Sequence, residues 1–370
     1  MATGRDRDRH YMRLAIREAR KGLGRTSPNP CVGAVVVKNN RVVGKGYHHR
    51  AGTPHAEVHA LEAAGGQARG ATLYVTLEPC NHQGRTPPCA EKVLAAGIGR
   101  LVVGMNDPNP LVRGGGNAYL LSRGLEVVAG VLSEQCRALN RPFIKHVTTG
   151  RPWVIMKAGQ SLDGRIATRN GHSQWITQAP ARERSHLWRD RVDAILVGIE
   201  TVLADDPSLT ARPRRRKGHD PLRVVLDSSL RLPLTARLLT QVSTARTLVF
   251  CGRKAALERR SSLAEAGAEV VEVQDDPRGG LVLAEVLKVL GQRAVNSLLV
   301  EGGGRIHAAF LKDGLYDQAC IFVAPLFLGA DGVPAVGDLG LARVDGARRF
   351  TPSRVQRLGN DIMIEGLFGE

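Results

Sequence analysis

The chain has 370 residues, more than a single hydrophobic core usually serves, so we expect two domains. Hydrophobic residues make up 43% of it and charged residues 24%, which is typical of a globular protein and excludes a disordered or fibrous one. The longest apolar runs, residues 32–37 and 321–328, are too short to span a membrane, and no apolar stretch follows the charged N-terminus. We therefore expect a cytoplasmic protein without a secretory signal.

The net charge is +17, from 52 basic and 35 acidic residues. A balance this basic is typical of proteins that bind nucleic acid. Most of the basic residues are arginines, however, and such a bias can also be compositional. Aromatic residues make up only 4%, too few for the stacking platforms that single-strand binders use. The charge alone leaves the choice of partner open.

The first half of the chain has the pattern of a sheet covered by helices. A helix is expected over residues 11–21, and the run Ser27-Pro28-Asn29-Pro30 then forms a loop. Two strands follow at residues 32–38 and 42–46, joined as a hairpin by Asn39-Asn40. The remaining elements alternate, with helices at 55–64 and 90–96 and strands at 71–77 and 100–104.

Pro142, Gly150 and Pro152 indicate a domain junction, and we expect domains at residues 1–147 and 148–370. In the second domain strands are expected at residues 153–157, 194–198, 223–227, 247–251, 297–300 and 320–325, and helices at 179–191, 255–266, 283–290 and 305–311. This alternation predicts an α/β domain with a largely parallel sheet. Residues 231–292 carry no recognisable motif and are interpreted only as scaffold.

Three side chains of the first domain predict a catalytic zinc site. One imidazole, His55, and two thiolates, Cys80 and Cys89, would leave the fourth tetrahedral position open for water, which zinc makes easier to deprotonate. Glu57, two residues after His55, would move protons between that water and a substrate. This is the pattern of zinc nucleobase deaminases, except that eight residues separate the two cysteines where two are usual. Each residue alone is more often structural, and the combination favours the metal.

The second domain contains Glu301 and three glycines, Gly302 to Gly304, followed by Arg305, between an expected strand and an expected helix. Glycines there let a phosphate approach backbone N–H groups at a helix N-terminus, although a tight turn is at least as common an explanation. The basic run at residues 212–217 favours a solvated loop over a phosphate or nucleic-acid site.

Several stretches closely resemble the family of bifunctional riboflavin biosynthesis deaminase/reductases. They are residues 27–33, 54–61, 77–89 and 107–110 in the first half, and 157–165, 173–177 and 201–210 in the second. The wide spacing of the two cysteines is the pattern of that family. The resemblance implies a cytidine-deaminase-like three-layer domain followed by a dihydrofolate-reductase-like α/β domain.

For the first domain the resemblance implies hydrolytic deamination of 2,5-diamino-6-ribosylamino-4(3H)-pyrimidinone 5′-phosphate. It implies that His55, Cys80 and Cys89 hold one Zn²⁺ per chain, that Glu57 is the catalytic proton shuttle, and that Asn29 contacts the ring.

For the second domain the resemblance implies NADPH-dependent reduction of the ribosyl group to a ribityl chain, giving 5-amino-6-ribitylamino-uracil 5′-phosphate. The implied cofactor residues are Gly159, Trp175, Thr201, Asp205, Ser228, Gly303, Gly304 and Arg305, and the implied substrate residues are Ser173, Arg189, Leu209, Arg212 and Glu301. Arg189 and Arg212 suit a 5′-phosphate because a guanidinium offers forked hydrogen bonds.

For the second domain, a dihydrofolate-type reductase or a degenerate regulatory domain stays open. Two alternatives also stay open for the first domain. A nucleic-acid deaminase of the tRNA type, fused to a dihydrofolate-reductase-like domain, would use the same zinc chemistry and suit the charge. A zinc-stabilised RNA-binding module would need a closed four-ligand site, and only three good ligands are visible. We expect a small phosphorylated ribosylaminopyrimidine as the substrate, no nucleic-acid or membrane partner, and a homo-oligomer, either a dimer or a tetramer.

Overall fold

The computed structural model describes residues 4–81, 88–110, 115–214 and 218–369. It divides into two compact units, Met1–Gly150 and Arg151–Glu370. The boundary expected from the sequence, between residues 147 and 148, falls inside helix α6 (Arg141–Thr149). Within the described stretches, no helix combines the length and the apolar composition that crossing a bilayer requires.

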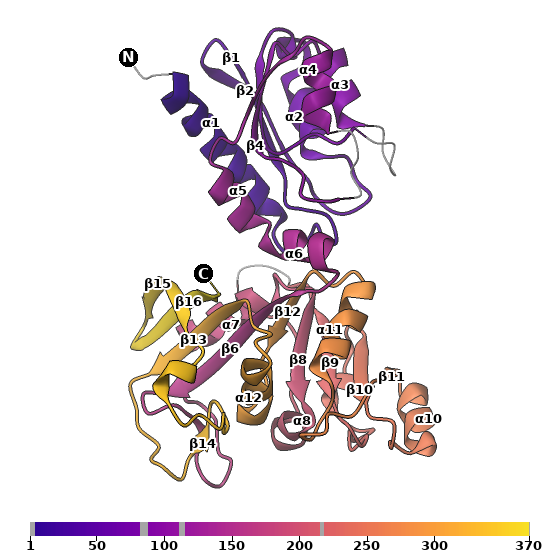
Figure 1. Ribbon diagram of the computed structural model, residues 1–370, viewed down its shortest axis with the longest axis vertical. Coiled ribbons are helices and arrows are strands. Elements are labelled where there is room, and N and C mark those ends of the chain that lie inside the picture. Colours follow the sequence, from indigo (N-terminus) through magenta and orange to yellow (C-terminus); the bar gives the residue numbers. More distant parts are fainter. Residues whose placement is uncertain (1–3, 82–87, 111–114, 215–217, 370) are drawn as a thin grey trace. The chain divides into compact units, whose positions relative to one another are not determined.

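Unit one is built on a five-stranded sheet in the order β2-β1-β3-β4-β5 (Figure 1). The strands are β1 (Gly33–Lys38), β2 (Arg41–Tyr47), β3 (Thr72–Leu77), β4 (Arg100–Met105) and β5 (Glu126–Ala129), and the helices besides α6 are α1 (Gly4–Ala19), α2 (Ala56–Ala64), α3 (Cys89–Ala95), α4 (Gly116–Ser122) and α5 (Ser133–Leu139). β1 is antiparallel to both β2 and β3, whereas β3, β4 and β5 are parallel.

Glycines bring helices close to both faces of this sheet. A Cβ on Gly33 would lie 2.1 Å from the carbonyl oxygen of Ala15 in α1, and a Cβ on Gly46 would lie 2.4 Å from that of Ala56 in α2. Gly46 pairs with Ala34, the neighbour of Gly33, so the two glycines face opposite sides of the sheet. Helix α1 therefore covers one face and α2 the other, which gives the three layers expected.

The expected hairpin is confirmed, because Asn39 and Asn40 join β1 to β2 with φ of 49° and 61°, the left-handed pair that a type I′ turn requires. Helix α1 begins at Gly4, seven residues before the expected start. Its first turns are held by Asp8, whose buried carboxylate bonds to Tyr74 and Arg100 on the sheet. The sequence did not indicate α4, β5, α5 and α6.

Unit two is built on a nine-stranded sheet in the order β11-β10-β9-β8-β12-β6-β13-β16-β15. Its strands are β6 (Trp153–Ser161), β8 (Ala194–Gly198), β9 (Leu222–Leu226), β10 (Thr247–Cys251), β11 (Ala268–Glu272), β12 (Ser297–Val300), β13 (Gln318–Ala324), β15 (Phe350–Leu358) and β16 (Asp361–Phe368), and a separate pair is formed by β7 (Arg165–Ala167) and β14 (Val333–Pro334). The seven strands from β11 to β13 are parallel, as expected, and the antiparallel hairpin β15–β16 extends the sheet.

Helices α7 (Ala179–Arg189), α8 (Ile199–Asp205), α9 (Arg237–Thr240), α10 (Leu257–Glu265), α11 (Leu283–Gln292) and α12 (Gly304–Lys312) belong to this unit. The central strands β8 and β12 are buried along their whole length, because a parallel sheet is covered on both faces. In open α/β sheets ligands bind beyond the carboxyl ends of such strands. The expected second site lies at the carboxyl ends of β6, β8, β9 and β12.

Candidate active sites

The three expected metal ligands of unit one come from three element termini. His55 is the residue immediately before α2, Cys80 follows β3, and Cys89 begins α3. The Nδ1 atom of His55 lies 3.1 Å from the sulfur of Cys89 and 3.6 Å from that of Cys80. Among the described residues this is the one cluster of three or more such groups that could hold a metal ion.

The two cysteines are adjacent in space although eight residues separate them. The backbone N–H of Cys89 points to the sulfur of Cys80 at 3.3 Å, and the N–H of Ala90 donates to the carbonyl oxygen of Cys80 at 3.1 Å. These two bonds close the loop between the cysteines. The segment Gly84-Arg85-Thr86-Pro87-Pro88 between the cysteines favours a free nucleotide over a nucleic acid as the substrate, but its residues 84–87 lie outside the described residues, as does His82.

The donor set fits zinc. Tetrahedral zinc with Zn–N and Zn–S bonds of ordinary length holds a nitrogen and a sulfur ligand about 3.6 Å apart. The two N–S separations of 3.1 and 3.6 Å are close to that value. One imidazole and two sulfurs are also the ligands zinc prefers, and three protein ligands leave one coordination position for chemistry. His55, Cys80 and Cys89 can therefore hold a zinc ion with only small side-chain shifts.

The electrostatics of the site suit acid–base work. Glu57, in the first turn of α2, is only 3% exposed, and burial raises the pKa of its carboxyl. Hydrogen bonds from Cys89 and from the His55 ring lower the pKa of Cys80, which favours its thiolate form. A carboxyl group with a raised pKa, next to a sulfur and an imidazole, is suited to take a proton and to return it.

His48, the residue immediately after β2, is a further residue of the site. It is buried, and its ring lies edge-on to His55 with 5.3 Å between centroids. Its Nδ1 atom is 3.2 Å from the carbonyl oxygen of Pro54, and its Nε2 atom is 3.0 Å from the amide nitrogen of Asn29. Nδ1 therefore carries the proton, and Nε2 accepts from the Asn29 amide. Burial lowers the pKa of His48, which keeps the ring neutral and able to accept that bond.

A signal for His48 was present in the sequence. Gly44, Gly46 and His48 alternate along and just beyond β2, so they share one face, and both glycines pack closely against α2. That face leads to the N-terminus of α2, where His55 lies.

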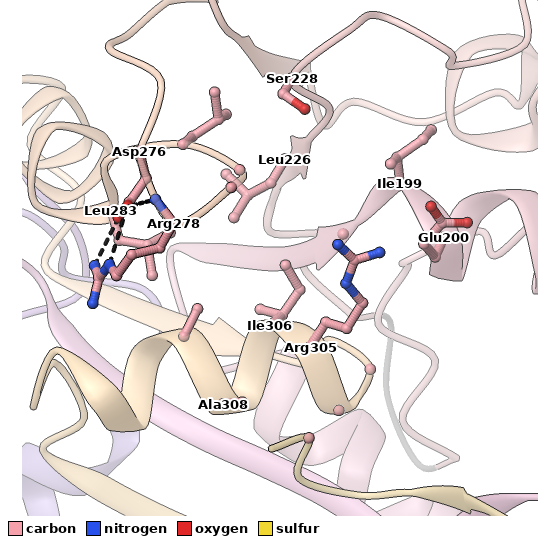
Figure 2. A pocket seen from close by; sticks show the side chains of 18 of the residues that line it. Ile199, Glu200, Leu226, Ser228, Asp276, Arg278, Leu283, Arg305, Ile306 and Ala308 are labelled. Atoms are coloured by element: carbon pink, nitrogen blue, oxygen red, sulfur yellow. Dashed lines mark hydrogen bonds and ion pairs between the residues drawn. The ribbon is translucent and has the colours of Figure 1, made fainter. Parts of the chain in front are cut away.

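In unit two a pocket of about 630 Å³ opens at the carboxyl ends of β8, β9 and β12 (Figure 2). Five of the expected cofactor residues line it: Thr201, Ser228, Gly303, Gly304 and Arg305. Its middle is apolar, with Leu226 and Ile306, and charged side chains lie at both ends. Such a pocket can take an elongated ligand that has a flat apolar part and anionic groups.

The three glycines before α12 have different roles. A Cβ on Gly302 would lie 2.6 Å from Ile306, and a Cβ on Gly304 would lie 2.4 Å from the carbonyl oxygen of Pro334, so the packing of the protein requires both. A Cβ on Gly303 would meet only the Thr201 hydroxyl, at 3.9 Å. Gly303 faces the pocket, where the missing side chain lets a ligand reach the backbone. The tight-turn explanation therefore accounts for two of the glycines and the ligand explanation for the third.

Glu301 lies at the centre of a buried ionic cluster. Its carboxylate accepts two hydrogen bonds from Arg189, at 2.8 and 2.9 Å, and one from the ammonium of Lys157, at 3.2 Å. Burial alone would raise the pKa of Glu301, but the charges of Arg189 and Lys157 lower it far below its usual range. The cluster therefore carries one more positive than negative charge at the carboxyl end of β12, beside the glycine turn.

Other expected substrate residues lie near this cluster. Arg189 also donates to the carbonyl oxygen of Thr210 at 3.3 Å, next to Leu209. The N–H of Arg212 points to the His186 ring at 3.3 Å, one helical turn before Arg189. The Leu209 side chain is buried in a hydrophobic cluster with Ile199 and Val202. Of the basic run, residues 215–217 lie outside the described residues.

Three expected cofactor residues do not line the pocket: Gly159, Trp175 and Asp205. Trp175 is 67% exposed and stacks on the guanidinium of Arg182 at 4.5 Å, so it is not the core aromatic that a structural role predicts. Asp205 is hydrogen-bonded to the hydroxyl of Ser173, and burial raises the pKa of its carboxyl. Gly159 lies on β6, where a Cβ would touch Thr177 at 3.4 Å.

The pocket also contains residues from the segment that the sequence analysis assigned to scaffold, residues 231–292. Arg231, Asp276, Arg278, Leu281 and Leu283 all line it. No local pattern marks them, because they come from two loops that only the parallel sheet brings together.

Comparisons with known proteins cover both units. The family model described as the cytidine and deoxycytidylate deaminase zinc-binding region matches residues 5–105, and the one described as the RibD C-terminal domain matches residues 152–364. The riboflavin biosynthesis protein RibD of Aquifex aeolicus (strain VF5) is 43% identical over 362 residues, which cover 97% of this chain and 98% of that protein.

Solved structures agree with these matches. RibD of Acinetobacter baumannii, form 1, superposes with a TM-score of 0.90 at 39% identity and covers 99% of this chain and 100% of its own. The diaminohydroxyphosphoribosylaminopyrimidine deaminase/5-amino-6-(5-phosphoribosylamino)uracil reductase of Thermotoga maritima superposes with a TM-score of 0.86 at 36% identity, with the same coverage.

Proposed function

The chain belongs to the RibD family of bifunctional riboflavin biosynthesis deaminase/reductases, and from that membership we propose the substrates, cofactors and residues of its two reactions. Unit one carries the deaminase and unit two the reductase. The observation that carries the proposal for unit one is the convergence of His55, Cys80 and Cys89 beside the buried Glu57.

The first reaction is hydrolysis of a ring amine of 2,5-diamino-6-ribosylamino-4(3H)-pyrimidinone 5′-phosphate. Water adds its oxygen to the ring carbon, the C–N bond breaks, and ammonia leaves as the carbonyl forms. His55, Cys80 and Cys89 would hold zinc, which supplies the Lewis acidity that makes water a nucleophile near neutral pH. Glu57 takes a proton from the attacking water and returns it to the leaving amine, a task that suits its raised pKa.

Asn29 would contact the pyrimidine next to this centre, and His48 would position it. His48 accepts a hydrogen bond from the Asn29 side chain, which fixes the orientation of that amide. An oriented amide presents its carbonyl oxygen to a ring N–H or amino group, and so selects a ring of the right hydrogen-bonding pattern.

The second reaction opens the ribosyl group of the deaminated product. The sugar carbon C1′ gains a hydride, its bond to the ring oxygen breaks, and that oxygen gains a proton, which leaves a ribityl chain. NADPH supplies the hydride. Gly303 supports this assignment, because its open side lets a dinucleotide phosphate reach the N–H groups that begin α12.

Lys157, Arg189 and Glu301 would hold the substrate at the carboxyl ends of β6 and β12. Two nitrogens of the Arg189 guanidinium already donate to Glu301. Fewer of its N–H groups are therefore free to bind a 5′-phosphate than the sequence analysis expected. The exposed Arg212 is better placed for that phosphate. The other residues expected from the family, Gly159, Trp175, Thr201, Asp205, Ser228, Gly304 and Arg305 for NADPH and Ser173 and Leu209 for the substrate, keep those proposed roles.

The test is one incubation of the purified chain with zinc, the diaminopyrimidine nucleotide and NADPH, in which ammonia and NADPH absorbance are followed together. We expect ammonia release first and NADPH oxidation after it. Ammonia release from an oligonucleotide, but not from the free nucleotide, would contradict the substrate. NADPH absorbance that stays constant when the deaminated product is supplied would contradict the reductase.

Two variants separate the reactions. Glu57→Gln should retain zinc while ammonia release falls by at least about a hundredfold, because the amide cannot shuttle a proton. Asp205→Asn should slow NADPH oxidation and leave ammonia release intact. Unchanged ammonia release in Glu57→Gln would rule out the shuttle, and loss of both activities in Asp205→Asn would indicate misfolding.

A further inference from the structure

Charged side chains line the pocket in unit two, and of its arginines only Arg305 has so far been given a role. Three arginines line the pocket: Arg231, Arg278 and Arg305. Arg278 is committed to the protein, since it lies 2.7 Å from Asp276 and 2.9 Å from Asp313. Arg305 forms no ion pair with any residue in the described part of the chain. Arg231 forms an ion pair with Glu200, at 2.5 Å.

The backbone that carries Arg231 is held in place, whereas its side chain is free to change partner. Asp227 accepts a hydrogen bond from the N–H of Leu232 at 2.8 Å, and Arg259 donates to the carbonyl oxygens of Leu230 and Leu232 at 3.0 and 2.6 Å. The Arg231 and Glu200 side chains are 48% and 59% exposed. Ion pairs this exposed stabilise a protein little, so Arg231 can exchange the Glu200 carboxylate for another anion at low cost.

The sheet order fixes which part of a dinucleotide reaches Arg231. The nicotinamide ring must meet the substrate, which the Lys157–Glu301 cluster places at the ends of β6 and β12. The order β9-β8-β12-β6 puts the end of β9 three strands from β6, about 14 Å at the usual strand spacing. The adenosine half therefore lies at β9, where Leu226 and Ser228 line the pocket and the Arg231 turn follows.

The charges at this end distinguish two kinds of adenosine ribose. A carboxylate binds the free 2′-hydroxyl of NADH, whereas an arginine accommodates the 2′-phosphate of NADPH. Figure 2 shows the side chains of Glu200 and Arg305 at the same end of the pocket. With Arg231 paired to Glu200, two guanidinium groups face one carboxylate, and the excess of one positive charge favours the phosphorylated ribose.

We propose that Arg231, assisted by Arg305, binds the 2′-phosphate of the cofactor and so selects NADPH over NADH, and that Glu200 holds Arg231 until the phosphate replaces it. This inference rests on the proposed reductase function. It adds the residues that determine the preference for NADPH. One of them, Glu200, competes with the cofactor for Arg231.

The test uses two nucleotides that differ only in the 2′-phosphate, adenosine 2′,5′-bisphosphate and 5′-AMP, titrated calorimetrically into the full chain. Arg231→Gln should weaken the bisphosphate at least about tenfold and 5′-AMP less than about twofold, because a charge-assisted bond to the phosphate is lost. Glu200→Gln should act in the opposite direction and increase the affinity for the bisphosphate, since the competing carboxylate is gone.

Arg237→Ala is the matched control. It removes an exposed arginine that pairs with Asp206 outside the pocket, and the affinities for both nucleotides should stay at the wild-type values.

Kinetics give a second readout. In Arg231→Gln the KM for NADPH should rise by a similar factor, while the KM for NADH stays constant. Equal weakening of both nucleotides, or of neither, in Arg231→Gln would overturn the inference. A wild-type chain that oxidises NADPH but binds the two nucleotides equally would overturn the inference alone. A wild-type chain that binds neither nucleotide and oxidises no NADPH with the deaminated product would instead overturn the proposed reductase.

Discussion

The proposed metal ligands of unit one owe their geometry to where each lies in an element. His55 precedes α2, Cys89 begins α3, and Cys80 is tied to both Cys89 and Ala90 by backbone hydrogen bonds. Positions at element termini have little freedom to move, because the packed helix or strand behind them fixes the backbone. Among the described residues only these three form the candidate metal cluster, so the loss of one leaves two.

Replacing Cys80 by serine should abolish zinc binding. A hydroxyl is a poor zinc ligand, and the two ligands that remain cannot complete the tetrahedron. We expect bound zinc to fall from one ion per chain to near zero after dialysis, with an affinity more than about a hundredfold lower. Cys136→Ala is the control, because Cys136 is a buried cysteine of the same unit outside the cluster, and its zinc content should not change. A Cys80→Ser chain with a full zinc ion would show that this sulfur is not a ligand.

Site residues that belong to a local sequence motif could be predicted from the sequence. Site residues that only the fold brings next to the site could not. His55, Glu57, Cys80 and Cys89 stand in a recognisable spacing, and the structure gathers them. His48 could be found only by knowing which face of β2 meets α2. Glu200 and Arg231 follow different strands of a parallel sheet, and neither has a pattern around it that indicates a pocket.

Among the elements, α1 shows how a tertiary contact extends a helix beyond its local signal. Only residues 11–21 have helical hydrophobic periodicity, yet the helix begins at Gly4. Asp8 lies within the added turns, and its carboxylate accepts bonds from Arg100 at 2.8 and 2.9 Å and from the Tyr74 hydroxyl at 2.9 Å. A charged residue in an alternating charged run looks solvent-exposed in the sequence, whereas here it is buried and paired.

The paired Asp8 gives unit one a pH-dependent stability. Burial alone would raise the pKa of Asp8, but the bonds from Arg100 and Tyr74 outweigh it and lower the pKa. The stability that a lowered pKa confers is complete above the unfolded-state value, about 3.9, and is lost as the pH falls through the folded-state value. Asp8→Asn should therefore lower the free energy of unfolding by about 2 kcal/mol at pH 7.

That difference between Asp8→Asn and the wild type should shrink as the pH falls below about 4. Urea unfolding across this range measures it, with a chelator in every sample so that loss of zinc affects all variants equally. Glu134→Gln, which removes an exposed acid of α5, is the control and should match the wild type throughout. An Asp8→Asn deficit that persists unchanged at pH 3 would mean that packing, and not the charge, is what the substitution removes.

On the scale of the whole molecule, the two reactions use separate parts of the chain. All the proposed deaminase residues lie between Asn29 and Cys89, and all the proposed reductase residues between Lys157 and Arg305. Each unit has its own hydrophobic core, the first around β1, β3 and β4 and the second around the parallel strands. The sequence predicted this division because both halves carry complete motifs. Nothing in such motifs indicates an oligomeric state, so the homo-oligomer stays a prediction, as does the cytoplasmic location.

Unit one extends well beyond the residues that carry its motifs. The deaminase family model ends at residue 105, but the compact unit continues to Gly150. The buried Asn140, between α5 and α6, explains why: its side chain accepts a bond from the N–H of Cys31 at 2.8 Å and donates to the Cys31 carbonyl oxygen at 3.1 Å. This pair of bonds holds the loop that carries Asn29 beside the metal ligands. The last helices of the unit therefore support the site although they contribute no catalytic group.

Two fragments test this view of the molecule. Residues 1–150, produced alone, should fold, bind one zinc ion and release ammonia within roughly a factor of ten of the full chain, because a complete domain keeps its own core. Residues 1–122 contain every proposed deaminase residue but lack Asn140, so their loop at Asn29 has lost its anchor, and ammonia release should fall by a further factor of about ten or more. Circular dichroism and zinc content distinguish a folded but inactive fragment from an unfolded one. Full activity in residues 1–122 would show that the deaminase ends where its motifs end.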